Sequence, residues 1–303
     1  MFPPYSCRPV RFETPRQFLL AGLWFGGERP RQAFIFVHGL GGSAFSHQDW
    51  LAPLAGRRNA VLYFNNRGHD TVAGLRQMSR TSKPGHPYAC AGVAHEVFTD
   101  CVDDLQGAVN LCRRQGTRRI YLAGHSTGCQ KIVYYLSRAR TQARIAGAVL
   151  LCPISDYAGA RHTNEARRHR AERVARRLAR NGRGHELLPV RLWPGPGATD
   201  CQALDAQRFL SLYTPDSAEE IFTYAQPGKI PRALRKIKIP LQVILAGADE
   251  YADRPAENLA AWFAANMRSC RAEIQIVTGA SHSFQGHESQ LMRLLRRGLP
   301  PRA

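Results

Sequence analysis

The chain has 303 residues and a mass of 33.8 kDa, with 44% hydrophobic and 21% charged residues. This length fits one large α/β domain or two small domains, and the composition excludes collagen-like, disordered and coiled-coil proteins. No apolar run approaches the ~18 residues of a membrane helix, and the N-terminal segment lacks the basic and apolar regions of a secretory signal. We therefore expect a soluble, cytoplasmic protein without membrane insertion.

The formal net charge is +19, and only five of the 42 basic residues are lysine. Nine arginines and two glutamates lie between Arg161 and Arg183. A GC-rich genome yields such arginine-, alanine- and glycine-rich chains without a functional cause. The functional alternative is an anionic partner, such as nucleic acid, a membrane surface or an acidic substrate.

Short apolar runs alternate with helical patterns along the chain. The first predicted strand spans Phe18–Phe25 and is expected to pair with Val10–Glu13. Continuous apolar runs, typical of strands buried on both faces, follow at residues 33–37, 60–64, 118–124, 145–152, 239–247 and 272–279. Helices are predicted at residues 94–112, 130–139, 255–267 and 286–297. The alternation predicts an α/β fold with a mostly parallel central sheet and helices on both faces.

Two segments interrupt this alternation. Residues 67–92 form a polar excursion that contains Lys83-Pro84-Gly85-His86-Pro87 and is long enough to predict a loop that lines a site. Residues 156–237 lack a strand pattern, and an apolar stripe within them predicts an amphipathic helix: Ala171, Val174, Ala175 and Leu178. We expect a helical, arginine-rich lid at 156–237, inserted after the sixth strand between core segments 1–155 and 238–303.

The eight cysteines are scattered, without a C-x-x-C pair or zinc-ligand spacing. Cys101 and Cys112 lie eleven residues apart in a helical pattern, which places them on one buried face. The sequence therefore predicts reduced thiols, no metal site and no cofactor.

A G-x-S-x-G motif, Gly124-His125-Ser126-Thr127-Gly128, directly follows the apolar run Ile120–Ala123 and precedes a helical pattern. In this context a tight turn exposes the hydroxyl of Ser126, and the helix N-terminus directs its amides at the reacting centre. A structural turn serine is the alternative. The strand–turn–helix order favours Ser126 as a nucleophile.

A serine nucleophile needs a base oriented by a third group, and in α/β-hydrolases the chain order is serine, acid, histidine. Asp249 directly follows one predicted strand and His282 follows the next, at the edge where open α/β sheets bind ligands. Glu250 and Asp253 compete with Asp249 as the acid, and His125 and His287 compete with His282 as the base. The order of these residues along the chain and their positions after predicted strands favour Asp249 as the acid and His282 as the base.

A glycine-rich segment, Phe36–Gly42, follows the third predicted strand. Its glycines allow backbone amides to approach a developing oxyanion, together with the amide of the residue after the nucleophile. We expect the oxyanion hole to be formed by the amides of Leu40 and Thr127. His38 is expected to brace this loop.

These residues resemble the α/β-hydrolase superfamily over the whole chain, and Asn66-Arg67-Gly68-His69-Asp70 matches its usual Arg-Gly-His turn. A narrower resemblance links the chain to a little-characterised hydrolase family that includes fungal siderophore esterases. It rests on three segments: Gly124–Gln130, Cys152–Asp156 and Gly247–Tyr251. The resemblance supports Asp249 as the acid and implies ester hydrolysis, including in secondary metabolites. Ala252-Asp253 departs from the Val-Pro that the family has after Asp-Glu-Tyr.

The sequence thus predicts a metal-independent serine esterase with a small-molecule ester as substrate. An amide or thioester hydrolase, or an acyltransferase, could use the same residues. The arginine-rich lid would suit a substrate that carries a carboxylate or phosphate. A basic binding protein for nucleic acid or an anionic surface is the alternative of another class, but the basic run has no interleaved aromatic residues for base stacking, which disfavours nucleic acid.

Overall fold

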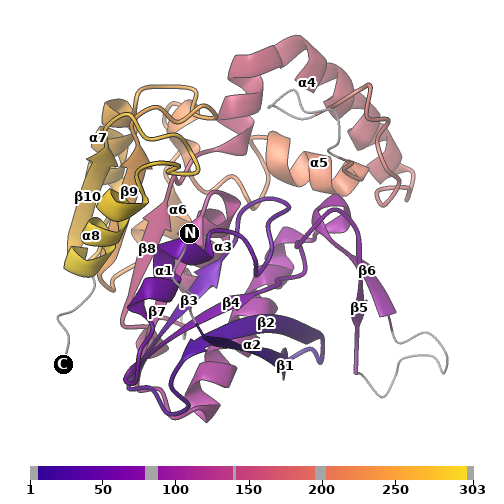
Figure 1. Cartoon of the computed structure of the whole chain (residues 1–303). Helices are drawn as coiled ribbons and strands as arrows, with labels where there is room; N and C mark the ends of the chain where they lie inside the picture. The colour runs from indigo at the N-terminus through magenta and orange to yellow at the C-terminus, as the bar shows by residue number, and fades with distance from the viewer. Residues whose placement is uncertain (1–5, 79–87, 139–140, 195–202, 299–303) are drawn as a thin grey trace.

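A mostly parallel sheet forms the centre of the computed structural model, which describes residues 6–78, 88–138, 141–194 and 203–298. Its strands are β1 (Cys7–Glu13), β2 (Leu19–Gly26), β3 (Gln32–Val37), β4 (Asn59–Phe64), β7 (Arg119–His125), β8 (Gly147–Leu151), β9 (Leu241–Ala246) and β10 (Ala272–Val277). They are ordered β1-β2-β4-β3-β7-β8-β9-β10 (Figure 1). β1–β2 and β2–β4 are antiparallel, and all other neighbours are parallel. The predicted sheet and each of its strands are confirmed.

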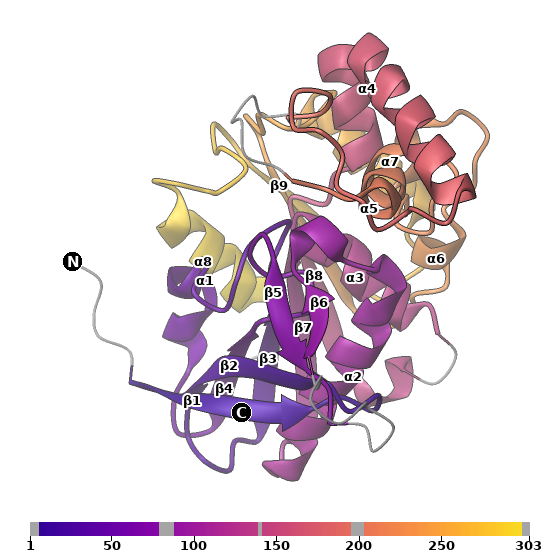
Figure 2. The same ribbon diagram turned by 90° about the vertical axis from the view of Figure 1, so that its right-hand side faces the viewer.

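Helices cover both faces of this sheet. The buried cluster on one face includes side chains of α2 (Cys101–Arg114), α3 (Thr127–Leu136) and α7 (Ala256–Asn266). The cluster on the other face includes side chains of α1 (Gln48–Leu51) and α8 (Glu288–Gly298), which lie beside each other in Figures 1 and 2. Burial on both faces explains why the strands are continuous apolar runs without alternation.

Short helices complete the connections. They are the 3-10 helices η1 (Ala52–Leu54), η2 (Val93–His95), η3 (Phe98–Asp100), η4 (Gln142–Arg144) and η5 (Thr223–Ala225), and the one-turn helix α6 (Arg232–Arg235).

The predicted helix at 94–112 is wrong in its first part, because α2 begins only at Cys101. Glu96 and Val97 have extended backbone angles between η2 and η3, and the Val97 side chain is exposed to solvent. Glu96 instead turns inward and forms buried ion pairs with Lys131 (2.6 Å) and Arg208 (2.7 Å). Ion pairing of a buried carboxylate overrides the apolar periodicity here, since an unpaired charge in the interior is costly.

The segment predicted as a loop at 67–92 contains a second, two-stranded antiparallel sheet of β5 (Ala73–Arg76) and β6 (Tyr88–Ala91). The two strands stand to one side of the main sheet in Figure 1. Thr71 and Val93, just outside the two strands, line the pocket described below. The Lys83–Pro87 part of the prediction lies outside the described residues.

Two helices between β8 and β9 lie above the main sheet in Figure 1, namely α4 (Asp156–Arg180) and α5 (Ala206–Tyr213). Ala171 and Ala175 of α4 are fully buried in a third cluster that includes Trp193 and Phe209. Val174 and Leu178 pack partly buried against the same cluster. The predicted apolar stripe of an amphipathic helix is therefore confirmed.

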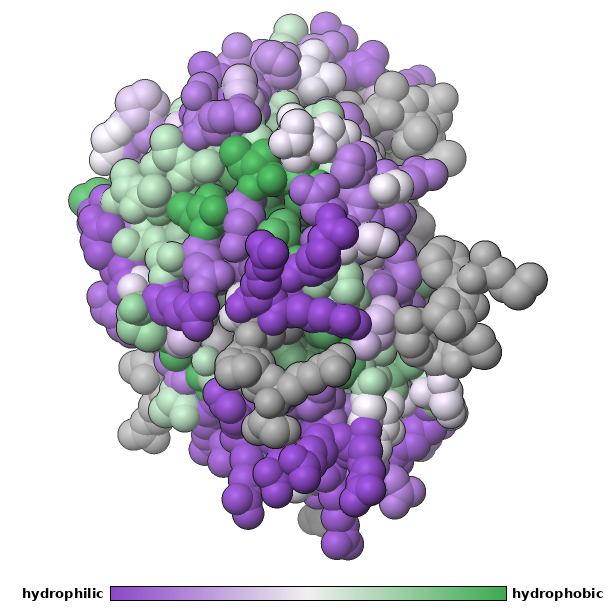
Figure 3. All heavy atoms as spheres, turned by 60° about the vertical axis from the view of Figure 1, so that its left-hand side comes forward, coloured by the Kyte–Doolittle hydropathy of each residue, from purple (hydrophilic) through white to green (hydrophobic). Residues whose placement is uncertain are grey.

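Exposed arginines occupy the solvent side of α4 at positions 170, 173, 177 and 180. Hydrophilic residues also cover most of the molecular face in Figure 3, where apolar residues gather mainly in the upper half. In the described part of the chain, no helix combines the length and apolar character needed to cross a membrane.

The seven cysteines that the structure describes carry free thiols. Cys101 and Cys112 are both buried on α2, as their spacing predicts. Cys201 lies outside the described residues.

Candidate active site

Ser126 occupies a sharp turn between β7 and α3, as the G-x-S-x-G motif predicts. Its backbone angles are φ 53° and ψ −127°, an unusual conformation for a residue with a side chain. The turn is held by a hydrogen bond from the Ser126 amide to the carbonyl of Leu151 on β8 (3.0 Å). A Cβ on Gly128 would overlap the carbonyl oxygen of Val37, so only glycine lets α3 approach the end of β3 this closely.

Asp249 and His282 follow the ends of the neighbouring parallel strands β9 and β10. The Nδ1 atom of His282 lies 2.8 Å from Oδ2 of Asp249, and the two side chains are only 9% and 5% exposed. Parallel pairing of β9 with β10 brings their carboxyl ends to one edge, which explains this contact. Ser126 and His282 line the same pocket of about 460 Å³.

The competing acids have other partners. Glu250 accepts a hydrogen bond from the backbone amide of His282 through Oε2 (2.8 Å). Asp253 forms an ion pair with Arg254 (2.8 Å). Of the three acids considered from the sequence, Asp249 is therefore the one that contacts the His282 ring.

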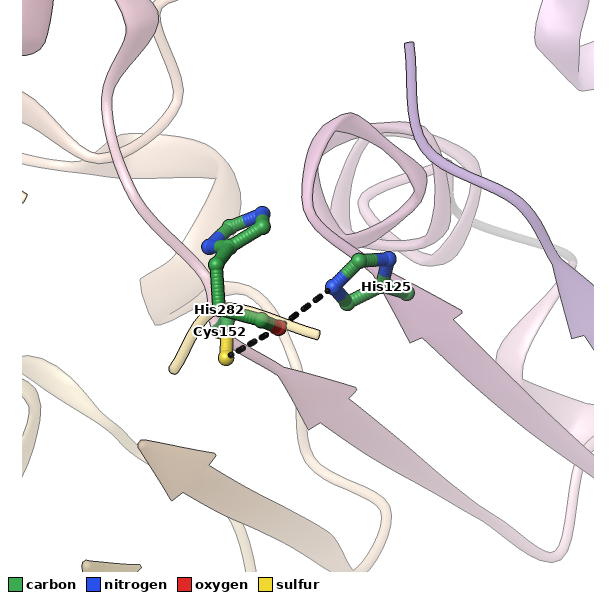
Figure 4. A group of neighbouring side chains, drawn as sticks. All are labelled: His125, Cys152 and His282. Carbon is green, nitrogen blue, oxygen red and sulfur yellow. Dashed lines mark hydrogen bonds between the residues drawn. The ribbon is translucent and has the colours of Figure 1, made fainter. Parts of the chain in front are cut away.

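The backbone carbonyl of His282 is also bound, by two residues at the ends of β7 and β8 (Figure 4). His125 donates from Nε2 (3.0 Å) and Cys152 from its thiol (3.4 Å). Burial, together with the nearby His282 and His47, lowers the pKa of His125 well below its usual value, and burial raises that of the Cys152 thiol. Both groups therefore keep the protonation state that this contact needs: a neutral imidazole and a protonated thiol.

His125, Cys152 and His282 also form a group of metal-ligand type, with one possible ligand atom of each within 4.8 Å of the others. Metal binding by cysteine requires the thiolate, whereas burial keeps this thiol protonated. Asp249 already occupies Nδ1 of His282. Hydrogen bonding to the His282 carbonyl accounts for the group better than a metal does.

The loop after β3 approaches the nucleophile. A Cβ built on Gly39 would lie 2.9 Å from Cβ of Ser126, so the loop backbone passes directly beside the serine. Leu40 lines the pocket, and Thr127 is the first residue of α3, where amides lack an intrahelical acceptor. This arrangement is compatible with the oxyanion hole predicted from Leu40 and Thr127.

His38 braces the same loop. It is buried, donates from Nδ1 to the carbonyl of Gly39 (2.9 Å) and accepts from the amide of Asn66 at Nε2 (3.3 Å). Burial lowers its pKa to about 3, so the ring stays neutral. These contacts agree with the bracing role expected for His38.

Several pocket residues were not predicted from the sequence. Among them are His47, which stacks on Trp50 (3.9 Å between ring centroids), and Asp156, the first residue of α4. Asp156 lies in the Cys152–Asp156 segment that carries the family resemblance, a signal that could have identified it. The anchoring contacts of His125 and Cys152 depend on where each side chain points, which a strand pattern does not specify.

The strand order and the serine turn define an α/β-hydrolase fold, and solved structures agree. Siderophore hydrolase EstB from Aspergillus fumigatus shares 18% identity over 99% of this chain and 100% of its own, with a TM-score of 0.64. The α/β hydrolase GrgF from Penicillium shares 17% identity over 96% of both chains, with a TM-score of 0.64. A soluble variant of the Saccharomyces cerevisiae monoglyceride lipase shares 14% identity over 99% of this chain and 100% of its own, also with a TM-score of 0.64.

The chain belongs to the family described as "Protein of unknown function (DUF1749)", which matches residues 88–297. No curated protein sequence matches the chain. The α/β-hydrolase resemblance expected from the sequence is confirmed.

Proposed function

We propose that the protein is a serine hydrolase that cleaves carboxylic esters through Ser126, His282 and Asp249. One observation carries this proposal. His282, whose Nδ1 lies 2.8 Å from Asp249, and the strained, partly exposed Ser126 line one pocket. A buried acid–histidine pair next to such a serine has the arrangement of a nucleophile, its base and the group that orients the base.

In the proposed reaction, Oγ of Ser126 attacks the acyl carbonyl while Nε2 of His282 accepts its proton. Asp249 accepts from Nδ1–H and stabilises the imidazolium. The amides of Leu40 and Thr127 donate to the tetrahedral oxyanion, for which a well-placed donor is worth ~3–4 kcal/mol. His282 then protonates the leaving alkoxide, and water hydrolyses the acyl-enzyme by the same steps in reverse. No metal or cofactor takes part in this proposal.

A small-molecule ester, including a secondary-metabolite ester, is the proposed substrate. Two of the solved structures similar to this chain are named as a siderophore hydrolase and a monoglyceride lipase. These names favour an ester as the substrate over an amide or a thioester. We further propose that residues 156–237 act as a lid over the core segments 1–155 and 238–303. Asp156, Gly159, Ala160 and Thr163, all on α4, line the pocket and support this role.

Hydrolysis of p-nitrophenyl esters from acetate to octanoate, combined with fluorophosphonate labelling, tests the proposal. Wild-type protein is expected to turn over esters and to be labelled, and Ser126→Ala to lose both. Ser137→Ala, at the other end of α3, is the matched control and should retain both. Labelling without turnover would mean a competent nucleophile with a different substrate. Absence of labelling in wild type would overturn the proposal and favour the basic binding protein.

A further inference from the structure

The pocket beside Ser126 is lined by acidic rather than basic side chains. Among the described residues that line it, Asp156 and Glu250 are carboxylic, and none is arginine or lysine. Burial lowers the pKa of two of its histidines, to about 4 for His47 and well below the usual value for His125, so neither of these rings supplies a positive charge. The exposed arginines of α4 at positions 170, 173, 177 and 180 do not line this pocket. The arginine content of the lid therefore gives no support to an anionic substrate at this pocket.

Asp156 contacts no cation within the described chain at ion-pair distance. Its Oδ2 accepts a hydrogen bond from the side-chain amide of Gln130 on α3 (2.9 Å). Arg208 is near enough to lower the pKa of Asp156. However, the Arg208 guanidinium already binds Glu96 (2.7 Å) and Glu219. The carboxyl that reaches the pocket is thus left without a counterion of its own.

Asp156 is part of a larger cluster in which carboxyls outnumber cations. Behind it lie Glu96, Glu219 and Glu220, with Lys131 and Arg208 as the cations in ion-pair contact among the described residues. Glu220 accepts from the Ser155 hydroxyl (2.8 and 2.9 Å) and the Gln226 amide (3.2 Å), both neutral donors.

Unpaired buried carboxylates are unfavourable, so such a cluster either retains protons or takes up a cation. Burial, with like charges nearby, raises the pKa of Asp156 to about 8 and that of Glu220 to about 7. Only Asp156 of this cluster lines the pocket. A cationic group entering the pocket would replace the proton of Asp156.

We propose that Asp156 is a specificity determinant that binds an ammonium group of the substrate, so that the enzyme prefers esters with a positive charge in the acyl or alcohol part. This inference rests on the proposed function, because the pocket is the proposed active site. Glu250 adds a second negative charge at the same pocket while one of its oxygens holds the His282 amide. Neutral esters bind without this ion pair, and anionic esters cannot form it and also meet the carboxylate of Glu250.

Two matched ester series test the proposal, one for each part of the substrate. The acyl series is p-nitrophenyl 6-aminohexanoate, heptanoate and hydrogen adipate. The alcohol series is the hexanoate of 2-(dimethylamino)ethanol, of 3-methylbutanol and of 3-hydroxypropionate. In at least one series we expect kcat/KM for the ammonium ester to exceed that of the neutral isostere about tenfold, which is about 1.4 kcal/mol. The anionic ester should be slowest.

Asp156→Asn is expected to lower this ammonium-to-neutral ratio at least fivefold. Asp216→Asn is the matched control, because Asp216 is exposed, is paired with Arg176 and lies outside the pocket; it should leave the ratio unchanged. Equal rates for ammonium and neutral esters in both series would overturn the inference, as would an unchanged ratio in Asp156→Asn. No hydrolysis of any ester above Ser126→Ala would instead overturn the proposed function.

A measurement on wild-type protein covers the case in which Asp156→Asn does not fold, since Asp156 begins α4. Hexylammonium, 1-hexanol and hexanoate are compared as protectants of Ser126 against fluorophosphonate labelling. We expect hexylammonium to protect at a concentration about tenfold lower than hexanol does, and hexanoate to protect least. Protection that follows the opposite order would contradict the inference.

Discussion

The sheet edge that carries Ser126, Asp249 and His282 differs from the segment between β8 and β9, which lines the same pocket through α4, in how polar groups are held in place. At the sheet edge, each of these residues follows the end of a parallel strand, so parallel strand pairing places all three at one edge. Between α4 and β9, the buried ion pair of Arg208 with Glu96 (2.7 Å) holds α5 against the core. The positions of the core residues thus follow from local sequence pattern, whereas the position of α5 depends on a contact between residues far apart in sequence.

The largest expected effect is a difference in kcat between substitutions of Asp249 and of Glu250, the two acids that follow β9. Asp249→Asn is expected to lower kcat by about 10⁴-fold, because the amide stabilises the wrong histidine tautomer. Glu250→Gln keeps an oxygen that can accept the His282 amide hydrogen, so its loss of kcat should stay below about tenfold. Steady-state kinetics on one p-nitrophenyl ester measures both. Equal losses in the two variants would show that the strand-end position does not select the acid.

The second prediction concerns the buried ions under α5. Arg208→Ala leaves the carboxylates of Glu96 and Glu219 without a shared cation, and breaking such a buried pair costs about 3–5 kcal/mol of unfolding free energy. The exposed pair of Arg183 with Glu186 is the control, and Arg183→Ala should not change the urea midpoint measurably. A midpoint for Arg208→Ala within error of wild type would contradict a structural role for the cluster.

Sequence patterns predicted the sheet, the serine turn and the acid–histidine contact because each depends on local periodicity or on strand order. The start of α2 was not predictable in this way. An apolar stripe runs from Ala94 to Cys112 and predicts one helix. Within this range, however, Glu96 forms buried ion pairs with Lys131 and Arg208, and Arg208 lies over a hundred residues further along the chain. The presence of Asp156 in the pocket likewise depends on how α4 packs, which periodicity does not encode.

The third prediction is a pH dependence of stability caused by Asp156 and Glu220. Folding raises their pKa values to about 8 and about 7, so the folded state holds protons that the unfolded state has released. Their stabilising contribution is complete at low pH and is lost as the pH rises from the unfolded pKa near 4 through these folded values.

Between pH 6.5 and 8 this loss should not be masked by His38, His47 and His125, whose lowered folded pKa values affect stability only as the pH falls below about 6.5. Asp156→Asn is expected to flatten the slope of unfolding free energy in this range by about 1 kcal/mol per pH unit. Urea unfolding at four pH values measures the slope. A slope identical to wild type would mean that Asp156 ionises normally in the folded protein.

The smallest effect concerns the anchor of the His282 carbonyl. Cys152→Ala removes the thiol donor (3.4 Å), and sulfur is a weak donor, so we expect kcat to fall only about two- to fivefold while KM stays within twofold. His125 still donates to the same oxygen (3.0 Å). Cys152→Ser restores a hydroxyl donor and should recover most of the lost kcat. If Cys152→Ser lost as much activity as Cys152→Ala, the thiol would matter through its volume in the core and not through its hydrogen bond. Loss of kcat with rescue by the hydroxyl would instead show that the sheet edge aligns its histidine through the backbone as well as through Asp249.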